Sequence, residues 1–573
     1  MRQTDFRQTG GKEEIGAGEV SVRSPKPSKI LEFRQRVPQK NLLREVIDMK
    51  KIGFWVLVLF VGLQATVMAA DVTINFSRSF YGTLPLDPHQ AGNAGRYDNL
   101  NQAYDGLVFA NDDGKIIPSL AESWTISKDW KEFNFILRKG VKFHDGTPLN
   151  AEAVKFSFDR IVGIDNHAVA QWRPLAKGGA KVEATGEYSV KFSFPNPYPL
   201  FMRELVYACY GVVSPTYVKK YATAQDPWAK ERMSYDTCGT GPFKFVSHEP
   251  KQKIVFEKNS NYWAGEKGKV PGGKVMPKYD RLILSVVQDP TTRRIMFEKG
   301  EIDIATDFPV DMVEDLRKVQ GVTMVDFPLL WDAWIYINCS KKPFDDVRVR
   351  QAISYAIDYD KIIKDIERGV ALPLRGIIPK GMMGYNPNRF RYNRDVAKAK
   401  ALLSEAGYPN GFSMTLIYSP ERRNEFEQES VLIQSFLKDI GVDVKIEKMA
   451  YTSQLARQVA GNFDLAMTHF MAGTGDPSVV CHSYLPPDVP YGSPQYSFRW
   501  RNAKVIELLH KAITIPDSPE REKMYAEVDD MGMKEAAFIP LYQILKSVAI
   551  RSNVTGFKYD TLRRAVLWEA SKK

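Results

Sequence analysis

The amino-acid sequence predicts an α/β protein of two lobes with an additional α+β domain. Strand–helix–strand patterns recur in two separate stretches, residues 282–305 and 414–467, and such patterns are typical of mostly parallel sheets with helices on both faces. Residues 111–235 instead alternate apolar and polar side chains, as antiparallel strands with one solvent-facing side do. The 573-residue chain is also too long for a single hydrophobic core.

Residues 49–69 have the pattern of a secretory signal peptide. Met49 is followed by two lysines, residues 53–62 (GFWVLVLFVG) are apolar, and small residues precede Ala70 where a signal peptidase would cleave. The apolar run is shorter than the roughly 20 residues that a membrane-spanning helix needs. We therefore expect a periplasmic protein whose mature form begins near Ala70 or Asp71. Because no lipobox cysteine follows the apolar run, we expect no lipid anchor.

Residues 1–48 are polar, rich in charge and without the periodicity of a packed helix or strand. We expect either a disordered segment or one that is not translated, with Met49 as the true start. The alternative is a cytoplasmic tail on an uncleaved anchor, since its basic residues would follow the positive-inside rule. The N-terminus of the mature protein distinguishes the two.

The charges and cysteines narrow the class of protein. The 79 Lys and Arg and 68 Asp and Glu are interspersed, with no basic block of the kind that binds nucleic acid. In an oxidising compartment, Cys209 and Cys238 are candidates for a disulfide that closes a loop of about 30 residues. Cys339 and Cys481 could pair or remain buried thiols. No CxxC pair indicates a zinc or redox site.

The additional α+β domain is predicted over residues 111–234. Residues 132–137 (EFNFIL) and 189–194 (SVKFSF) alternate as half-buried strands do. Between them, Asn150 is a suitable N-cap for a helix over residues 151–161, which carries apolar residues along one side.

The first strand–helix–strand series follows this domain. Residues 282–287 (LILSVV) form an apolar run of strand length, and Asp289 then caps a helix over residues 291–299. Gly300 supplies a left-handed end to the helix, and residues 302–305 form the next strand.

The second series repeats this pattern nearer the C-terminus. Gly441 and Gly461 end its two helices, and a short apolar strand begins within two residues of each glycine. The series consists of strands 414–418, 442–446 and 463–467 and of helices 425–440 and 452–460.

Six segments, taken in order, carry a resemblance to one family. They are residues 143–159 (FHDGTPLNAEAVKFSFD), 239–245 (GTGPFKF), the pair Tyr262-Trp263 after Lys258-Asn259, and residues 297–303 (FEKGEID), 344–358 (FDDVRVRQAISYAID) and 397–408 (AKAKALLSEAGY). With them, the chain resembles the family 5 solute-binding proteins of ABC importers, the oligopeptide-, dipeptide- and nickel-binding group.

The resemblance implies a two-lobed periplasmic-binding-protein clamp, type II-like, that closes over a solute. Closure is a population shift, because the solute contacts both lobes only in the closed state. The implied role is to deliver a small solute, peptide or peptide-like, to a membrane permease as a monomer, without a cofactor and without enzymatic activity. The implied domains are lobe I at 71–110, 235–330 and 541–573, the extra domain at 111–234, and lobe II at 331–540.

The resemblance also indicates a ligand loop in lobe II. In peptide-binding relatives this loop carries an aromatic residue followed by an Asp that grips the peptide amino group. The matching stretch is residues 469–478 (HFMAGTGDPS), which places Phe470 at the aromatic position and Gly473 at the amine-gripping position. Asp476 remains, either as a ligand residue or as a turn cap. Because a buried ammonium without an acceptor is costly, either another carboxylate binds the amine or the ligand lacks one.

Other candidate ligand residues are aromatic or cationic. Tyr81, Trp172, Phe470 and Tyr542 could stack on an apolar ligand face, although a core position is the ordinary role of such residues. Arg96 could bind a ligand carboxylate bidentately, although a solvated surface arginine is the ordinary alternative.

Three alternatives stay open. The solute could be an oligosaccharide, an opine or a nickel chelate, although of the histidines only His469 and His482, which flank Asp476, could converge on a metal. A periplasmic hydrolase is compatible with the fold class, but the sequence has no nucleophile elbow, HExxH or Walker motif. The protein could also present its ligand to a chemoreceptor.

Overall fold

The computed structural model describes most of the chain from residue 71 onward, and residues 70–573 form one compact unit. The predicted signal peptide and residues 1–48 lie outside the described part. The described residues are 71–79, 86–90, 97–112, 114–164, 180–423, 425–471, 475–489, 499–560 and 564–573.

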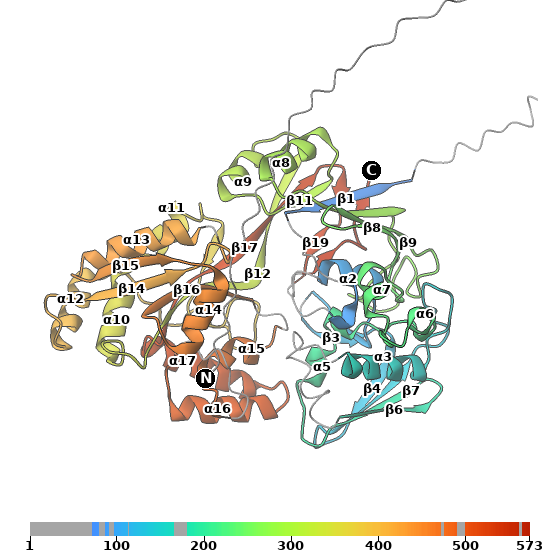
Figure 1. Ribbon diagram of the computed structural model, residues 1–573, viewed down its shortest axis with the longest axis horizontal. Coiled ribbons are helices and arrows are strands. Elements are labelled where there is room, and N and C mark those ends of the chain that lie inside the picture. Colours follow the sequence, from blue (N-terminus) through green and yellow to red (C-terminus); the bar gives the residue numbers. More distant parts are fainter. Residues whose placement is uncertain are drawn as a thin grey trace, which may run out of the picture. The chain divides into compact units, whose positions relative to one another are not determined.

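An eleven-stranded sheet runs through this unit (Figure 1). Its strands, in order across the sheet, are β15 (Asp443–Lys448), β14 (Ser413–Tyr418), β16 (Leu465–Met471), β12 (Val322–Ile337), β17 (Phe538–Arg551), β11 (Ile304–Thr306), β1 (Thr73–Arg78), β10 (Arg281–Val286), β9 (Lys253–Lys258) and β8 (Phe243–Glu249), with β13 (Ala371–Pro373) beside β17. The neighbours of β14 and of β1 are parallel to it. The expectation of mostly parallel sheets is nevertheless wrong, because β8, β9, β12, β13 and β17 add antiparallel neighbours.

Two long strands, β12 and β17, connect the halves of the sheet. β12 has 16 residues and β17 has 14, and they pair with each other antiparallel. Residues 331–337 of β12 also pair with β16, whereas residues 548–550 of β17 pair with β11. The β12–β17 register shifts between Pro328 and Asp332. The predicted lobe boundaries at residues 330 and 540 therefore fall inside two continuous strands.

Helices follow the predicted caps closely. Asp289 accepts a hydrogen bond from Thr292 N at the start of one helix, and Gly300 ends that helix with a φ of +85°. Gly441 and Gly461 are also left-handed, with φ of +83° and +77°. The α-helices of the described residues from 290 to 534 are α8 (Pro290–Lys299), α9 (Val310–Leu316), α10 (Val347–Ala356), α11 (Tyr359–Asp365), α12 (Val396–Glu405), α13 (Phe426–Lys438), α14 (Tyr451–Ala460), α15 (Pro477–Cys481), α16 (Ala503–Thr514) and α17 (Pro519–Lys534).

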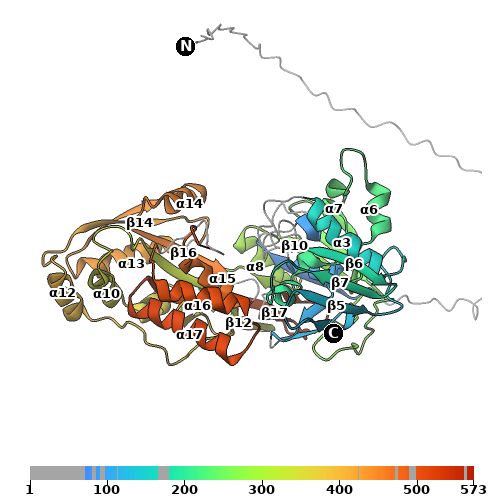
Figure 2. The same ribbon diagram turned by 90° about the horizontal axis from the view of Figure 1, so that it is seen from below.

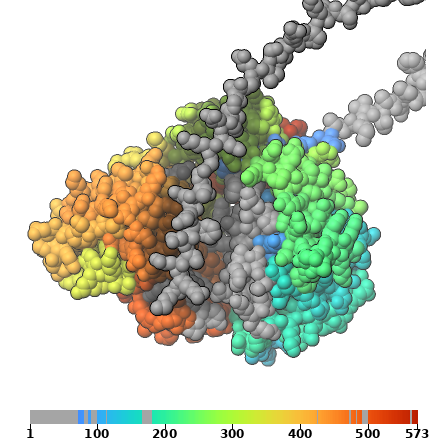
Figure 3. Space-filling model, in the orientation of Figure 1, coloured from blue at the N-terminus to red at the C-terminus, as the bar shows by residue number. Residues whose placement is uncertain are grey.

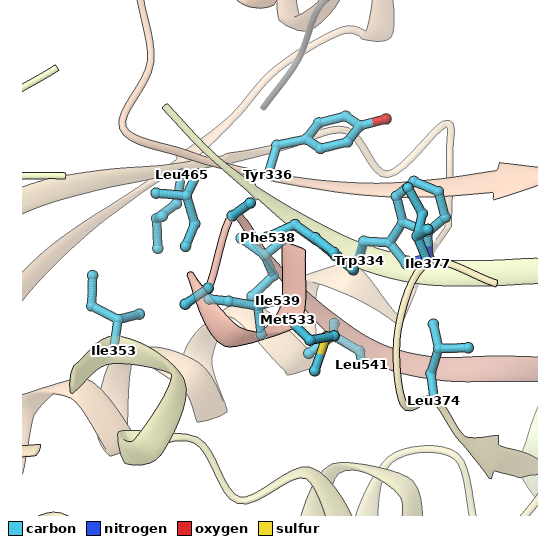
Figure 4. Close-up of a cluster of buried hydrophobic side chains, with 14 of the residues drawn as sticks. Trp334, Tyr336, Ile353, Leu374, Ile377, Leu465, Met533, Phe538, Ile539 and Leu541 are labelled. Carbon is cyan, nitrogen blue, oxygen red and sulfur yellow. The ribbon is translucent and has the colours of Figure 1, made fainter. Parts of the chain in front are cut away.

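The core of lobe II packs around the shared part of β12 and β17. α13 lies against β14 and β15, and α10 packs against α12. Trp334 and Phe538 are fully buried and their ring centroids lie 6.0 Å apart. Figure 4 shows them among the aliphatic side chains of Leu465, Ile539 and Leu541. This hydrophobic cluster runs from Leu330 to Ile544 and holds the strands that approach the cavity described below.

The extra domain is built on a four-stranded antiparallel sheet, as the alternating pattern predicts. The strands, in order, are β4 (Ala121–Ile126), β5 (Glu132–Leu137), β7 (Ser189–Ser193) and β6 (Lys181–Gly186). Phe133 and Phe135 are buried, whereas Ile136, which follows Phe135, is exposed. α3 (Ala151–Gly163) packs against β6 and β7 (Figure 2), and the Asn150 side chain accepts from Ala153 N at its start.

The core of the extra domain is continuous with that of lobe I, because one hydrophobic cluster contains residues of both. In the space-filling view, the cyan residues of the extra domain and the yellow to orange residues of lobe II lie on opposite sides (Figure 3). The shorter elements are η1 (Pro88–Gln90), α2 (Tyr97–Ala103), β2 (Val108–Ala110), β3 (Ile116–Pro118), α5 (Phe201–Glu204), η4 (Ala208–Tyr210), α6 (Pro215–Tyr221), α7 (Lys230–Tyr235), η5 (His482–Tyr484), β18 (Val554–Thr555), β19 (Lys558–Tyr559), β20 (Ala565–Val566) and β21 (Ser571–Lys572).

The four cysteines are buried thiols, so the predicted disulfide between Cys209 and Cys238 is wrong for this structure. Cys209 lies in η4, within the core. The Cys238 thiol is instead placed against Asp145 and Ser214, and burial together with the Asp145 charge raises the pKa of Cys238 to about 12. In the described part of the chain, no helix is long and apolar enough to span a bilayer.

Candidate functional site

A cavity of about 610 Å³ lies beside the two long strands β12 and β17. Both halves of the sheet contribute to its walls, and charged side chains of both signs line it. Its volume falls within the range typical of small-molecule sites, about 300–1,000 Å³. The wall residues used below are Ser79, Asp307 and Lys546 on one side and Trp331, Glu367 and Arg423 on the other.

The lobe I wall is held by Asp307, the residue that follows β11. Its φ of +64° lies in the left-handed region, which a non-glycine residue seldom adopts. Its carboxylate accepts hydrogen bonds from Ser79 N at 3.1 Å and Ser79 Oγ at 2.9 Å, and it forms an ion pair with Lys546 of β17. Burial alone would raise the pKa of Asp307, but the charges of Lys546 and Arg78 lower it below its usual range. This network fixes the ends of β1 and β11 against β17.

The lobe II wall contains an arginine shared among carboxylates. Arg423 Nη2 donates to Glu367 Oε2 at 2.5 Å, and Arg423 Nε lies 3.4 Å from Glu425 Oε2. Behind this pair, Tyr542 Oη donates to Glu429 Oε1 at 2.5 Å. The Arg423 guanidinium also lies 5.5 Å from the Tyr542 ring centroid. We call these five residues the Arg423 cluster.

The Arg423 cluster has more acids than bases. Glu367 is 1% exposed and Glu429 is fully buried. Burial raises the pKa of Glu429 to about 8 and the charge of Glu367 adds to the effect, while Arg423 and Tyr542 act in the opposite direction. Burial also raises the pKa of Glu367 although Arg423 stands beside it. Glu367 Oε1 and Glu429 Oε2 are buried and accept no well-formed hydrogen bond.

The end of β16 presents its side chains to opposite faces of the sheet. His469 packs edge-on against Trp331 at 4.8 Å between ring centroids, and Trp331 lines the cavity. Phe470, the next residue, stacks on Trp334 at 5.6 Å with 17° between the rings. Phe470 therefore packs against the core of lobe II on the face away from His469. The side chain of His482 lies outside the described part.

Asp476 is engaged by two arginines. Its carboxylate accepts a bidentate pair of hydrogen bonds from Arg521 at 2.8 and 2.9 Å, and Arg203 Nε lies 3.5 Å away. Asp476 Oδ1 also accepts from Ser478 N, which is the turn-capping contact expected of Asp before proline. Burial would raise the pKa of Asp476, but its bonds to Arg521 lower it. Arg203 belongs to α5 of the extra domain, so Asp476 connects that domain to lobe II.

The structure brings three of the seven proposed ligand residues into view. Tyr542 is buried, Phe470 is partly buried against the core of lobe II, and Asp476 is ion-paired. The remaining candidates, Tyr81, Arg96, Trp172 and Gly473, lie outside the described residues, so their roles stay predictions.

The Arg423 cluster was not anticipated. One signal for it was available in the run 421–429 (ERRNEFEQE): Glu429 lies three residues after Phe426, on the side of the helix that carries its apolar residues. Ordinary pattern analysis assigns such a charged residue to a solvated face, so the signal is weak on its own.

A mixed sheet whose two halves are joined by two long strands, with a charged cavity beside those strands, matches the two-lobed clamp of a solute-binding protein. The chain belongs to the bacterial extracellular solute-binding proteins of family 5, because the model described as "Bacterial extracellular solute-binding proteins, family 5 Middle" matches residues 115–512. It is therefore the solute-binding component of an ABC importer of the periplasmic or extracellular type.

Proteins that are similar to this chain over most of its length support this assignment. The chain is 30% identical over 525 residues to the probable D,D-dipeptide-binding periplasmic protein DdpA of Escherichia coli K12, covering 88% of this chain and 98% of DdpA. It is 31% identical over 505 residues to the glutathione-binding protein GsiB of Salmonella typhimurium, covering 85% and 92%. The structure of DppA from Helicobacter pylori in complex with the peptide STSA superposes with a TM-score of 0.71 at 28% identity, covering 88% and 98%.

Proposed function

We propose that this protein captures a peptide-like solute in the cavity beside β12 and β17 and delivers it to the membrane permease of an ABC importer. The cavity is the observation that carries the proposal, because its walls come from both halves of the sheet. A site so placed holds a solute well only when both walls contact it. Its charged lining suits a zwitterionic solute better than an apolar one.

The names of the relatives support the chemical class. DdpA is described as a probable D,D-dipeptide-binding protein, GsiB as a glutathione-binding protein, and DppA was solved with a bound peptide. All three ligands are short peptides or peptide derivatives. We propose the same class here, with an oligosaccharide, an opine or a nickel chelate as the alternative solute.

We propose bending within β12 and β17 as the closing motion. Both strands pass through both halves, and their register is irregular between Pro328 and Asp332, where fewer ladder bonds resist bending. The solute drives closure through contacts that exist only in the closed state. A solute of micromolar affinity supplies about −8 kcal/mol in total, part of which offsets bending and ordering costs.

The finer points of location and partnership belong to the same proposal. We propose a mature monomer that begins near Ala70 after cleavage of a signal peptide and that carries no lipid anchor. It acts by binding alone, without a cofactor or covalent chemistry, and presents the loaded clamp to the permease.

Native mass spectrometry of the chain purified from the periplasm tests this function. We expect a noncovalently bound solute of several hundred daltons or less, released on denaturation. X-ray scattering with and without that solute should show a smaller radius of gyration for the loaded protein. A bound metal ion alone would contradict the organic solute, and identical scattering profiles would contradict closure.

A further inference from the structure

The Arg423 cluster combines negative charge with two buried carboxylate oxygens, Glu367 Oε1 and Glu429 Oε2, that accept no well-formed hydrogen bond. The hydroxyl of Tyr542 is near enough to Glu367 to lower its pKa, but its one proton is donated to Glu429. Three glutamates, Glu367, Glu425 and Glu429, share the single guanidinium of Arg423. An unpaired buried carboxylate oxygen is costly, and its presence in a folded protein calls for a partner. The oxygen of Glu367 is an acceptor, so its missing partner is a hydrogen-bond donor, and the local excess of negative charge favours a cationic one.

The cluster reaches the cavity directly. Glu367, Arg423 and Glu425 line its wall, while Glu429 and Tyr542 lie immediately behind them. Glu367 is at once a wall residue, 1% exposed, and the owner of a buried oxygen without a well-formed hydrogen bond. A small rotation of that carboxylate would turn the oxygen toward a solute in the cavity.

The other cations that line the described part of the cavity have partners of their own. Lys546 forms an ion pair with Asp307, and the Arg293 guanidinium donates to the backbone oxygens of Val287 and Asp307. Arg368 is exposed, and its charge acts on Asp365. The shortage of positive charge is therefore concentrated at the Arg423 cluster.

We propose that the Arg423 cluster binds a cationic group of the solute, such as the α-ammonium of a peptide, through Glu367 and Glu425. Glu429, behind them, adds its negative charge when it ionises as the cation binds. This inference rests on the proposed function, since it assigns one end of the peptide-like solute to one place in the same cavity.

A proton should leave the protein when the cation arrives. With a pKa of about 8, Glu429 is mostly protonated at pH 7, because burial and the neighbouring Glu367 outweigh Arg423 and Tyr542, and Glu425 adds to the effect. A bound ammonium favours the ionised carboxylates, so the coupled glutamates lose up to one proton. Neutral solutes bound at the same place would release none.

The first experiment uses a defined set of di- to tetrapeptides, each present with its N-acetylated form, incubated with the full mature chain and analysed by native mass spectrometry. We expect the free-amine forms to be retained about 10- to 100-fold better, the range for a hydrogen bond to a charged group. Equal retention of both forms would overturn the inference while leaving peptide binding intact. Retention of no peptide would overturn the peptide class itself, and the inference with it.

Two matched variants locate the ammonium. Glu367→Gln should reduce the preference for free-amine peptides to less than about threefold, whereas Asp365→Asn should leave it unchanged, because Asp365 lines the same cavity but pairs with Lys361. A wild-type preference in Glu367→Gln would place the ammonium elsewhere and overturn the assignment. Circular dichroism and thermal unfolding establish that each variant is folded.

Calorimetry on the wild-type chain gives a second test, which does not depend on whether the Glu367→Gln variant folds. The best-retained free-amine peptide is titrated into the wild-type chain at pH 7 in phosphate and in Tris, whose ionisation enthalpies differ. We expect release of between about 0.5 and one proton per bound peptide, and less than half as much from Glu429→Gln. Identical heats in the two buffers would overturn the assignment.

Discussion

Two buried arginine–carboxylate groups in lobe II use the same chemistry to opposite effect. Around Arg521, the Asp476 carboxylate receives a bidentate guanidinium and a second arginine nearby, and its pKa is lowered. Around Arg423, three glutamates compete for one guanidinium, and the pKa values of Glu367 and Glu429 are raised. Both groups are buried, so burial does not distinguish them. The ratio of guanidinium groups to carboxylates does: the Arg521 group is balanced and serves as a structural anchor, whereas the Arg423 cluster has excess carboxylates that still lack a partner.

The largest expected effect comes from removing the cation of the balanced group. Arg521→Leu should lower the free energy of unfolding by about 3–5 kcal/mol, because it leaves the Asp476 carboxylate buried beside only Arg203. Urea denaturation at pH 7 measures the loss. Lys511→Met removes an exposed pair with Glu520 and should stay within about 0.5 kcal/mol of wild type. A loss below about 1 kcal/mol for Arg521→Leu would show that solvent reaches Asp476.

Neutralising an acid of the unbalanced group should have the opposite sign. The pKa of Glu429 rises from an ordinary 4.5 to about 8 on folding, so the folded state holds the proton and wild-type stability falls as pH rises through that interval. Glu429→Gln should therefore be more stable than wild type at pH 9, on the order of 2 kcal/mol, with a smaller difference at pH 5.

Urea denaturation at the two pH values measures this difference. Glu427→Gln is the matched control, since Glu427 lies on the same helix but is exposed and pairs with Lys448. A Glu429→Gln variant that is equally destabilised at both pH values would mean that Glu429 is ionised in the folded protein.

The pH dependence of Asp476 should run the other way. Its folded pKa lies below the ordinary 3.8, so its contribution is complete above that value and is lost as pH falls through the folded pKa. The stability difference between wild type and Asp476→Asn should therefore shrink by about 1 kcal/mol between pH 4 and pH 3. Thermal unfolding at the two pH values measures it. A constant difference would mean that the pKa of Asp476 is the same in the folded and the unfolded protein.

The smallest effect is expected at the edge of the balanced group. Arg203 is 20% exposed and its partner Asp517 is 45% exposed, so solvent screens their ion pair. Arg203→Gln should cost about 0.5–1 kcal/mol in the free energy of unfolding. Arg501→Gln, which removes a more exposed pair with Asp488, should cost less than Arg203→Gln does. A cost above about 2 kcal/mol for Arg203→Gln would mean that the contact between α5 and lobe II is fully desolvated.

The sequence predicts the local elements well because their signals are local. Asp289, Gly300, Gly441 and Gly461 act at the helix ends where the sequence predicts them, and the alternation around Phe133 marks the buried side of its strand. Strand pairing is not local, which is why the mixed sheet and the full length of β12 were not foreseen.

The candidate site could be predicted only in outline. The family resemblance identified Phe470 and Asp476, but the alternation of β16 places Phe470 on the core face, and the arginines around Asp476 come from distant parts of the chain. The Arg423 cluster depends on Glu367 and Tyr542, which are far from Arg423 in sequence. Likewise, the close sequence spacing of Cys209 and Cys238 does not lead to a disulfide between them in the structure.

The two long strands also bear on how the protein comes apart. One end of β17 packs in the lobe I cluster through Val548 and Ile550, while its other end packs in the lobe II cluster through Phe538 and Ile539. Unfolding of either half of the sheet would therefore remove a central strand from the other half. The two halves should therefore unfold together in one cooperative step on heating. A partly unfolded protein without solute, which proteases could cleave, should then be rarely populated.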